Sequence, residues 1–481
     1  MRRLFCGGVY SVLLLVMAIP FLAGAAEAEK RPDDLVFSPL SWEMVLPKRL
    51  DLKRADGLEI PVYFQRDNEL PLVDLTLLVG VGNVADPAGK SGLSELVAQL
   101  LRSGGSRHLR AAEVDRELER LAADLSVESG PYTIQLHLSV LAEELPRALE
   151  LLFALLEQPA FETERFELAR EQLLEQVRRR IEQPGALANQ LMMRRLYACH
   201  PLGHPPTVAT VSALTREDVQ AFHARYFGPA NVRIAVSGDV EATQLRQLLA
   251  AQLEPWQQVA QTVAVPELTG SLVAGTVVID RPLPQTTILL TERGIKIDNP
   301  DLYAVQVMNY ILGGGGFNSR LMREIRSNRG LAYSVYSWFS VGRRLPGPFV
   351  AGCETKNASV AQVLELFQQA MERMREEPVS EEDLALAKQS QINSFVFTFA
   401  NVQQLVERVM VQDHFAYPAD YLQRYRERIA AVTAEDVQRV ARRYLHPRQQ
   451  LTILVGQRNE IVLPETMAAQ TVEAVAAETL L

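Results

Sequence analysis

Cysteine is scarce in this chain of 481 residues, which contains only three. Cys6 precedes an N-terminal apolar run, so Cys199 and Cys353 are left for the folded part. Two cysteines in different halves of a chain do not make a disulfide framework. The fold must therefore be stabilised by a hydrophobic core, and hydrophobic residues make up 48% of the sequence.

Long blocks of one charge are also missing. The formal net charge is −9, and no basic arm or basic stripe stands out. Proteins that read nucleic acids normally present a basic face. We therefore expect no nucleic-acid partner.

Histidine is too scattered to suggest a metal site or a catalytic triad. Of the seven histidines, His200 and His204 have the i, i+4 spacing of a helical zinc pair, but Pro201, Gly203 and Pro205 around them prevent a helix. No Ser-His-Asp or Cys-His arrangement is evident. Chemistry on this chain must depend on other residue types.

The N-terminus has the form of a secretory signal peptide, residues 1–25. Two arginines precede the apolar run Val9–Ala25, which ends in small residues that offer an A-x-A cleavage site. The alternative is an uncleaved membrane anchor. No later stretch is long and apolar enough to span a bilayer, so we expect a periplasmic or secreted protein.

An internal repeat divides the rest of the chain. Residues 212–239 align without gaps with residues 430–457, at an offset of 218 residues, and share the pattern T-x-E-D-V-Q followed by a strand. A repeat of this length indicates a duplicated domain rather than a solenoid. The fold class expected is α+β, with two tandem homologous α/β domains. Their predicted limits are 38–253 and 272–463, with a linker at 254–271 and a tail, 464–481, that resembles a frayed helix.

The stretch 313–337 is the most informative in the sequence. Four glycines allow an unusual turn, residues 319–329 favour a helix, Gly330 ends it, and residues 331–339 favour a strand. Arg326 should lie on the last helical turn and Tyr333 near the start of the strand. A guanidinium and a phenol placed in this way can point into one space.

Several segments together resemble the pitrilysin/insulinase family of inverted-motif zinc peptidases. They are G-K-S-G-L at 89–93, L-x-x-x-P-x-F at 155–161, L-Y-x-x-H-P-x-G at 196–203, the segment 214–231, and R-G-L-A-Y-S-V-Y-S at 329–337. The resemblance covers residues 47–463. It implies that the two domains form one clamshell half of a peptidase chamber, with a second half on another chain.

The zinc motif of that family, His-x-x-Glu-His, is degenerate in this chain. Glu95 stands at the first histidine position, Ala98 at the general base and Gln99 at the second histidine, while the later glutamate ligand is retained as Glu175. Alanine cannot take a proton from water, and glutamine is a poor ligand. We therefore expect no catalytic zinc on this chain. A weak residual metal contact through Glu95 and Glu175 is the alternative.

The resemblance gives Arg326 and Tyr333 a role that the zinc positions lack. They match in type, spacing and flanking sequence a pair that, in the family, holds the substrate backbone and the developing oxyanion. It also suggests a backbone lining of the peptide chamber by the glycine run, whose plainer interpretation is a turn before a helix: Gly313, Gly314, Gly315 and Gly316.

The function expected is that of a metal-free subunit of a heterodimeric periplasmic zinc peptidase. A homologous partner chain would carry the zinc and the base, and the substrate would be a peptide or an unfolded protein segment. The alternative is a catalytically dead scaffold or a peptide-binding pseudo-peptidase.

Overall fold

The computed structural model describes residues 44–468 and 472–480, and the predicted signal peptide lies outside them. The first half of the chain builds a six-stranded sheet with the order β1-β4-β8-β5-β7-β6. Its strands are β1 (Lys48–Arg49), β4 (Val62–Arg66), β5 (Leu72–Val79), β6 (Asp124–Ser129), β7 (Ile134–Leu141) and β8 (Val232–Gly238). A short separate ladder pairs β2 (Leu52–Lys53) with β3 (Glu59–Ile60).

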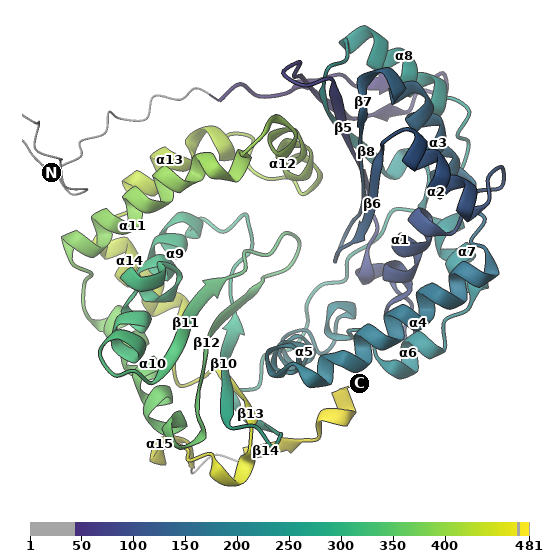
Figure 1. Cartoon of the computed structure of the whole chain (residues 1–481). Helices are drawn as coiled ribbons and strands as arrows, with labels where there is room; N and C mark the ends of the chain where they lie inside the picture. Colours follow the sequence, from purple (N-terminus) through teal and green to yellow (C-terminus); the bar gives the residue numbers. More distant parts are fainter. Residues whose placement is uncertain (1–43, 469–471, 481) are drawn as a thin grey trace, which may run out of the picture. The chain divides into compact units, whose positions relative to one another are not determined.

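Helices cover one face of this sheet (Figure 1). They bury a continuous core of leucine, valine and phenylalanine against it. The helices of the first half are α1 (Leu93–Ser103), α2 (Ala111–Arg120), α3 (Leu145–Glu157), α4 (Thr163–Arg179), α5 (Pro184–Leu196), α6 (Val208–Ser212), α7 (Arg216–Tyr226) and α8 (Ala242–Leu253).

The second half repeats this architecture around a sheet with the order β11-β12-β10-β13-β9-β14. Its strands are β9 (Gly275–Asp280), β10 (Gln285–Arg293), β11 (Ala332–Phe339), β12 (Pro348–Lys356), β13 (Leu451–Gly456) and β14 (Val472–Val475). Its helices are α9 (Leu302–Asn309), α10 (Val360–Glu376), α11 (Glu381–Ser394), α12 (Val402–His414), α13 (Tyr421–Ala431), α14 (Ala434–Tyr444) and α15 (Glu465–Ala468).

The duplication extends to the pairing of the strands. The central pairs β4–β8 and β9–β13 are parallel, and the neighbouring pairs β5–β8 and β10–β13 are antiparallel. The two halves differ at one edge, where β1 is antiparallel to β4 but β14 is parallel to β9. The predicted α+β class with two tandem homologous domains is confirmed.

The residues after 464 do not form the frayed helix that was predicted. Among the described residues of this tail, only the short α15 and a 3₁₀ turn, Ala477–Leu480, are helical, and β14 adds a strand to the second sheet. Ala477 and Leu480 are buried, and Arg194 of α5 donates hydrogen bonds to the carbonyls of Thr479 and Leu480. Ala477 and Leu480 are therefore part of the core that α5 forms with the second sheet.

Each half lends one helix to the sheet of the other half. The apolar side of α5 packs on β10 and β13 of the second sheet, and α12 packs on β4 and β8 of the first. The two helices occupy equivalent places in the repeat, because Pro184 and Val402 are separated by the same 218 residues. Residues 254–274 connect the halves, and none of them lies in a helix or strand.

The two exchanged contacts differ in chemistry. The α5 contact is apolar, whereas α12 adds polar side chains to an apolar contact made by Val406 and Met410. Glu407 of α12 accepts a hydrogen bond from Thr76 and has an oxygen 3.3 Å from Nδ1 of His137. Gln403 of α12 donates to Thr76 at 3.0 Å and accepts from Ser237 at 2.9 Å.

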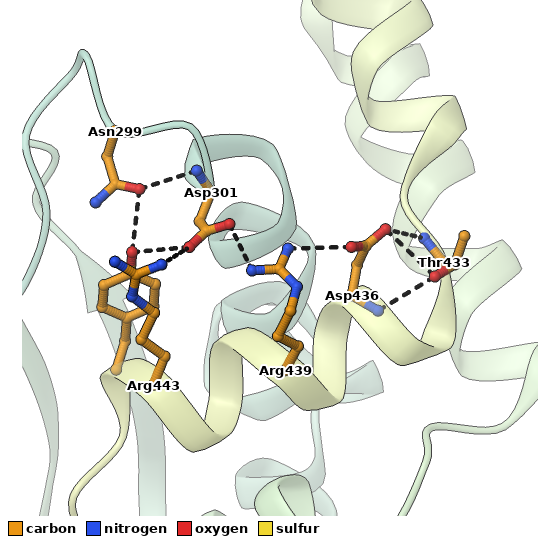
Figure 2. A network of polar contacts seen from close by, with 7 residues as sticks. Asn299, Asp301, Thr433, Asp436, Arg439 and Arg443 are labelled. Carbon is orange, nitrogen blue, oxygen red and sulfur yellow. Dashed lines mark hydrogen bonds and ion pairs between the residues drawn. The ribbon is translucent and has the colours of Figure 1, made fainter.

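A buried carboxylate joins α9 to α14 inside the second half (Figure 2). Asp301, whose side chain is 7% exposed, pairs with Arg439 at 2.6 Å and with Arg443 at 3.2 Å, and it accepts a hydrogen bond from the Tyr444 hydroxyl at 2.8 Å. Arg439 also contacts Asp436, which caps the start of α14 with Thr433.

Candidate functional site: an arginine between two aromatic rings

The glycine run begins where α9 leaves regular α-helical geometry. Residues 310–314 form a π-helical turn, in which the Gly315 N–H donates to the Tyr310 carbonyl five residues back, at 2.8 Å. Gly313 lies against β11, since a Cβ there would come within 2.5 Å of the Ser337 backbone nitrogen. A side chain at position 313 would therefore push the strand away.

The helix that carries Arg326 also has π-helical geometry, over Met322–Ser327. The Asn328 N–H donates to the Arg323 carbonyl five residues back, at 2.9 Å. Gly330 then ends the helix with a φ of 63°, in the left-handed region that glycine adopts without strain. The predicted order of helix, glycine stop and strand is confirmed, with a wider helical turn than sequence propensity indicates.

Arg326 and Tyr333 are brought together by this geometry. The guanidinium carbon of Arg326 lies 4.4 Å from the centre of the Tyr333 ring and 4.7 Å from the centre of the Phe317 ring. Both rings are largely exposed, Tyr333 at 82% and Phe317 at 63%. The guanidinium thus makes cation–π contacts with both rings.

The edge of this guanidinium is left available. Within the described part of the chain, Arg326 has neither an ion pair nor a side-chain hydrogen bond, and its contacts are those with the two rings. An arginine carries five N–H donors in one plane. The two ring contacts position the guanidinium while leaving these donors for a ligand.

Phe317 is the residue that sequence reasoning missed. It follows the glycine run in a short 3₁₀ turn, Gly316–Asn318, and reaches Arg326 only through the fold. An exposed aromatic side chain next to four glycines is the one signal that could have marked it, since such a ring has no core to fill.

Tyr333 lies on an edge strand whose pairing is irregular. β11 is the outermost strand of the second sheet, and its register against β12 shifts between Ala332 and Val335. Tyr333 and Ser334 therefore leave the regular ladder and are both exposed. They line a cavity of about 450 Å³, together with Glu354 and Lys356.

The other three glycines of the run are also required by close packing or by backbone conformation, in ways that do not involve a ligand. A Cβ at Gly314 would come within 2.7 Å of the Asn309 amide, and one at Gly315 within 2.7 Å of the Tyr310 ring. Gly316 has a φ of 57° with open space around it. Gly314 and Gly316 are exposed, so a backbone contact with a peptide at these positions stays a prediction.

The degenerate zinc positions lie around a separate cavity of about 500 Å³ in the first half. Glu95, Ala98 and Gln99 of α1 line it, opposite Gln172 and Gln176 of α4. The Gln99 amide donates to the Gln172 side chain, and Ala98 is 2% exposed. Burial raises the pKa of the Glu95 carboxyl, which Arg180 only partly offsets.

Glu175 does not belong to this cavity. Its side chain is half exposed and pairs with Arg179 at 2.8 Å. The position facing the degenerate motif from α4 is the adjacent Gln176. The sequence-based placement of a retained ligand at Glu175 is therefore corrected, and the weak contact through Glu95 and Glu175 loses its geometric basis.

These residues do not fit a zinc ion. Zinc sites use histidine, cysteine or carboxylate ligands, whereas this cavity offers one carboxyl with a raised pKa among amides. Arg102 and Arg165, which pair with Asp115, add positive charge to its wall. Across residues 44–468 and 472–480, histidine, cysteine, aspartate and glutamate nowhere gather into a group of three that suits a metal.

Comparison with known proteins identifies the family of the chain. Residues 62–208 match the family described as insulinase (peptidase family M16), and residues 213–391 match the peptidase M16 inactive domain. The chain belongs to the M16 family. The M16 chain is thus metallopeptidase-like in fold, although its first domain lacks the zinc ligands.

Relatives of the M16 chain include proteins named as proteases and one named as a non-peptidase. An uncharacterised zinc protease of Streptomyces coelicolor is 26% identical over 384 residues, 78% of this chain and 83% of that protein. The non-peptidase homolog YmxG of Helicobacter pylori is 26% identical over 321 residues, 66% of this chain and 74% of that protein.

Solved structures show the same fold. A peptidase M16 inactive domain from Pseudomonas fluorescens matches with a TM-score of 0.77 and 26% identity, over 87% of this chain and 99% of that one. A protease from Helicobacter pylori matches with a TM-score of 0.74 at 19% identity, over 85% of this chain and all of that one. Among the described residues, no helix of the M16 chain is long and apolar enough to cross a membrane.

Proposed function

We propose that this chain is the zinc-free subunit of a heterodimeric periplasmic peptidase. The observation that carries the proposal is the contrast between its two halves. The zinc positions hold Glu95, Ala98 and Gln99, whereas Arg326 and Tyr333 are kept, stacked and accessible. A homologous partner chain with an intact His-x-x-Glu-His motif would supply the metal and the base.

The contribution of this chain is to bind and polarise the substrate. Arg326 offers charged donors in a fixed plane, and the exposed Tyr333 hydroxyl offers a neutral donor beside it. Donors aimed at the oxygen on which charge develops lower the barrier by about 2.7–4 kcal/mol each. Their loss should therefore appear in the turnover of the pair.

The edge strand β11 supplies a way to hold the substrate. Its outer edge has no neighbouring strand among the described residues, and Tyr333 and Ser334 project from its irregular start. An extended peptide can add to such an edge through main-chain hydrogen bonds. Substrates would be peptides or unfolded segments that reach this strand.

The second candidate is a catalytically dead scaffold or peptide-binding protein. The corrected position of Glu175 favours it, because no zinc ligand then survives on the chain. The similarity to a relative named as a non-peptidase points the same way. The two candidates differ in whether Arg326 and Tyr333 affect catalysis by a partner.

The test is to purify the mature chain alone and together with a homologous zinc-bearing chain, and to measure cleavage of a quenched fluorescent peptide. We expect no cleavage by the chain alone with zinc, and cleavage by the pair. A chain that carries both Arg326→Ala and Tyr333→Phe should lower kcat/KM of the pair by roughly 100-fold or more. Arg323→Ala, on the same helix but paired with Asp383, should leave it nearly unchanged.

Two results would count against the catalytic role. Zinc-dependent cleavage by the chain alone would show that it needs no partner. Full activity of the pair with the doubly substituted chain would favour the scaffold instead.

A further inference from the structure

One cavity that the peptidase proposal leaves without a role lies where the two halves meet the linker. Its volume is about 510 Å³. The wall comes from both halves of the chain and from linker residues 262–267. The side chains that decide its chemistry are Tyr132, Arg233, Glu267, Arg344 and His414.

One arginine comes from each half. Arg233, on β8 of the first half, has a side chain that is 27% exposed. Arg344, in the loop between β11 and β12 of the second half, donates one hydrogen bond at 3.2 Å to the His414 carbonyl. The cavity therefore joins a cation from the first sheet with a cation from a loop of the second half.

The Arg233 guanidinium is poorly satisfied. Its nearest carboxylate oxygen belongs to Asp413 and lies 3.7 Å from Nε, beyond hydrogen-bond distance. Asp413 is already shared, because it accepts from the Tyr63 hydroxyl and lies 3.6 Å from Arg49. Among the described residues, Nε of Arg233 is buried without a hydrogen-bond partner.

The surroundings of His414 report a positive local field. Burial and the nearby Arg233, Arg344 and Arg343 lower the pKa of His414 to about 3, so its ring is neutral. Arg343 and Arg344 both lie over the Phe415 ring, at 4.8 and 5.4 Å. The opposing charges are Asp413 and the exposed Glu267.

We propose that this cavity binds a small oxyanion, a carboxylate or phosphate group, between Arg233 of the first half and Arg344 of the second. Guanidinium groups bind both kinds of oxyanion through paired N–H donors. The volume suits a small ligand. A ligand held by both arginines would bridge the first sheet and the loop of the second half, and so would stabilise their contact.

The test uses the whole mature chain at constant ionic strength set with sodium chloride. Inorganic phosphate is titrated while the thermal unfolding midpoint and the heat of binding are recorded. We expect a saturable rise in the midpoint. In Arg233→Gln and in Arg344→Gln the dissociation constant should increase about ten- to hundredfold, as expected for loss of a charge-assisted hydrogen bond.

A second titration, with peptides, distinguishes a carboxylate ligand from a phosphate ligand. A short peptide with a free C-terminal carboxylate is compared with the same peptide as its amide. Binding of the free acid but not the amide assigns a peptide terminus as the ligand, and binding of phosphate alone assigns a phosphate group. Failure of both probes to bind the wild-type chain would overturn the proposal.

Matched controls distinguish a site from general charge effects. Arg178→Gln removes an exposed arginine of α4 that does not line the cavity. It should leave both dissociation constants unchanged. Equal weakening by Arg178→Gln, or unchanged binding in both cavity variants, would overturn the proposal. Circular dichroism of each variant without added anion confirms that it is folded.

Discussion

The guanidinium carbon of Arg326 lies over the Tyr333 ring, 4.4 Å from its centre, and no hydrogen bond joins the two side chains in the described part of the protein. The Tyr333 hydroxyl and the Arg326 N–H edge can therefore both point at a third group. A hydrogen bond between them would have used one of the donors that the proposed function needs.

Removing the second ring should loosen Arg326 without removing its charge. Phe317→Ala deletes one cation–π contact, worth about 0.5–1 kcal/mol at an exposed site. We expect kcat/KM of the pair with a zinc-bearing partner to fall about two- to fivefold. Phe317→Tyr keeps the ring and should restore the activity. Equal values for the alanine and tyrosine variants would contradict a positioning role for Phe317.

Rebuilding the zinc motif should need four substitutions rather than three. Glu95→His, Ala98→Glu and Gln99→His restore the sequence pattern, but Glu175 faces Arg179 outside the cavity. Adding Gln176→Glu should tighten zinc binding by more than about tenfold, measured by competition with a chromophoric chelator. Equal affinity of the three- and fourfold variants would show that Glu175 can turn inward after all.

Two glycines of the run should respond differently to alanine. Gly313→Ala places a Cβ 2.5 Å from the Ser337 nitrogen, and displacing β11 should cost about 1–3 kcal/mol of unfolding free energy. Gly316→Ala meets no neighbour and should cost only about 1–2 kcal/mol for its left-handed φ. Peptide cleavage by the pair should fall further for Gly313→Ala, because the strand that moves carries Tyr333. A larger functional loss for Gly316→Ala would contradict this account.

Asp301 should anchor the second half. Burial alone would raise its pKa, but hydrogen bonds from Arg439 and Tyr444 outweigh burial and lower it. Its contribution to stability is therefore present above its ordinary pKa and is lost as the pH falls through the lowered value. Asp301→Asn at neutral pH should cost about 1–3 kcal/mol in denaturant unfolding.

Asp298→Asn is the matched control for Asp301, since the Asp298 side chain is 64% exposed and pairs only with Lys296 among the described residues. It should change the unfolding free energy by less than about 0.5 kcal/mol. Similar losses of unfolding free energy for the two variants would mean that the ion pairs and hydrogen bonds of Asp301 stabilise the fold no more than an exposed ion pair does.

The contact of α12 with the first sheet should depend on pH. The Glu407 hydrogen bond raises the pKa of His137, and hydrogen bonds from His137, Thr76 and Gln403 lower the pKa of Glu407 despite its burial. The stability that comes from the raised pKa of His137 is fully present below roughly pH 6.5. It is lost as the pH rises through the pKa of the folded state. The stability that comes from the lowered pKa of Glu407 is present above roughly pH 4.3.

The measurement is the difference in unfolding midpoint between wild type and Glu407→Gln. It should be larger at pH 6 than at pH 8.5. The buried His223 and His414 have lowered pKa values, about 4 and about 3, so they destabilise the fold as the pH falls. Both proteins carry these histidines, so their effect cancels when the two midpoints are compared at one pH. Glu128→Gln, an exposed neighbour of His137, should show a much smaller dependence, and a pH-independent Glu407→Gln difference would contradict the assignment.

The duplicated fold could be predicted because its strongest signals are local. Capping boxes at Thr215 and Thr433 open equivalent helices, and each is followed by an apolar strand of the core. The helices that cross between the halves were not predicted. In the sequence, Pro184 looks like the end of the preceding helix, but proline is equally suited to the first turn of a new helix, which is its role in α5.

The candidate site was predictable only in part. Arg326 and Tyr333 follow from one continuous motif, whereas Phe317 joins them through space. The error at Glu175 has a simple geometric origin, because adjacent residues on an α-helix point about 100° apart. Choosing the charged residue over its glutamine neighbour therefore selected the wrong face of α4.

The exchange of α5 and α12 has a consequence for the integrity of the chain. Peptide-bond cleavage anywhere in the irregular segment 256–269 would leave two fragments, each still holding a helix on the sheet of the other. Such a nicked protein should migrate as one particle under native conditions and as two bands in denaturant. Either fragment made alone would expose a sheet face that only its missing counterpart can cover.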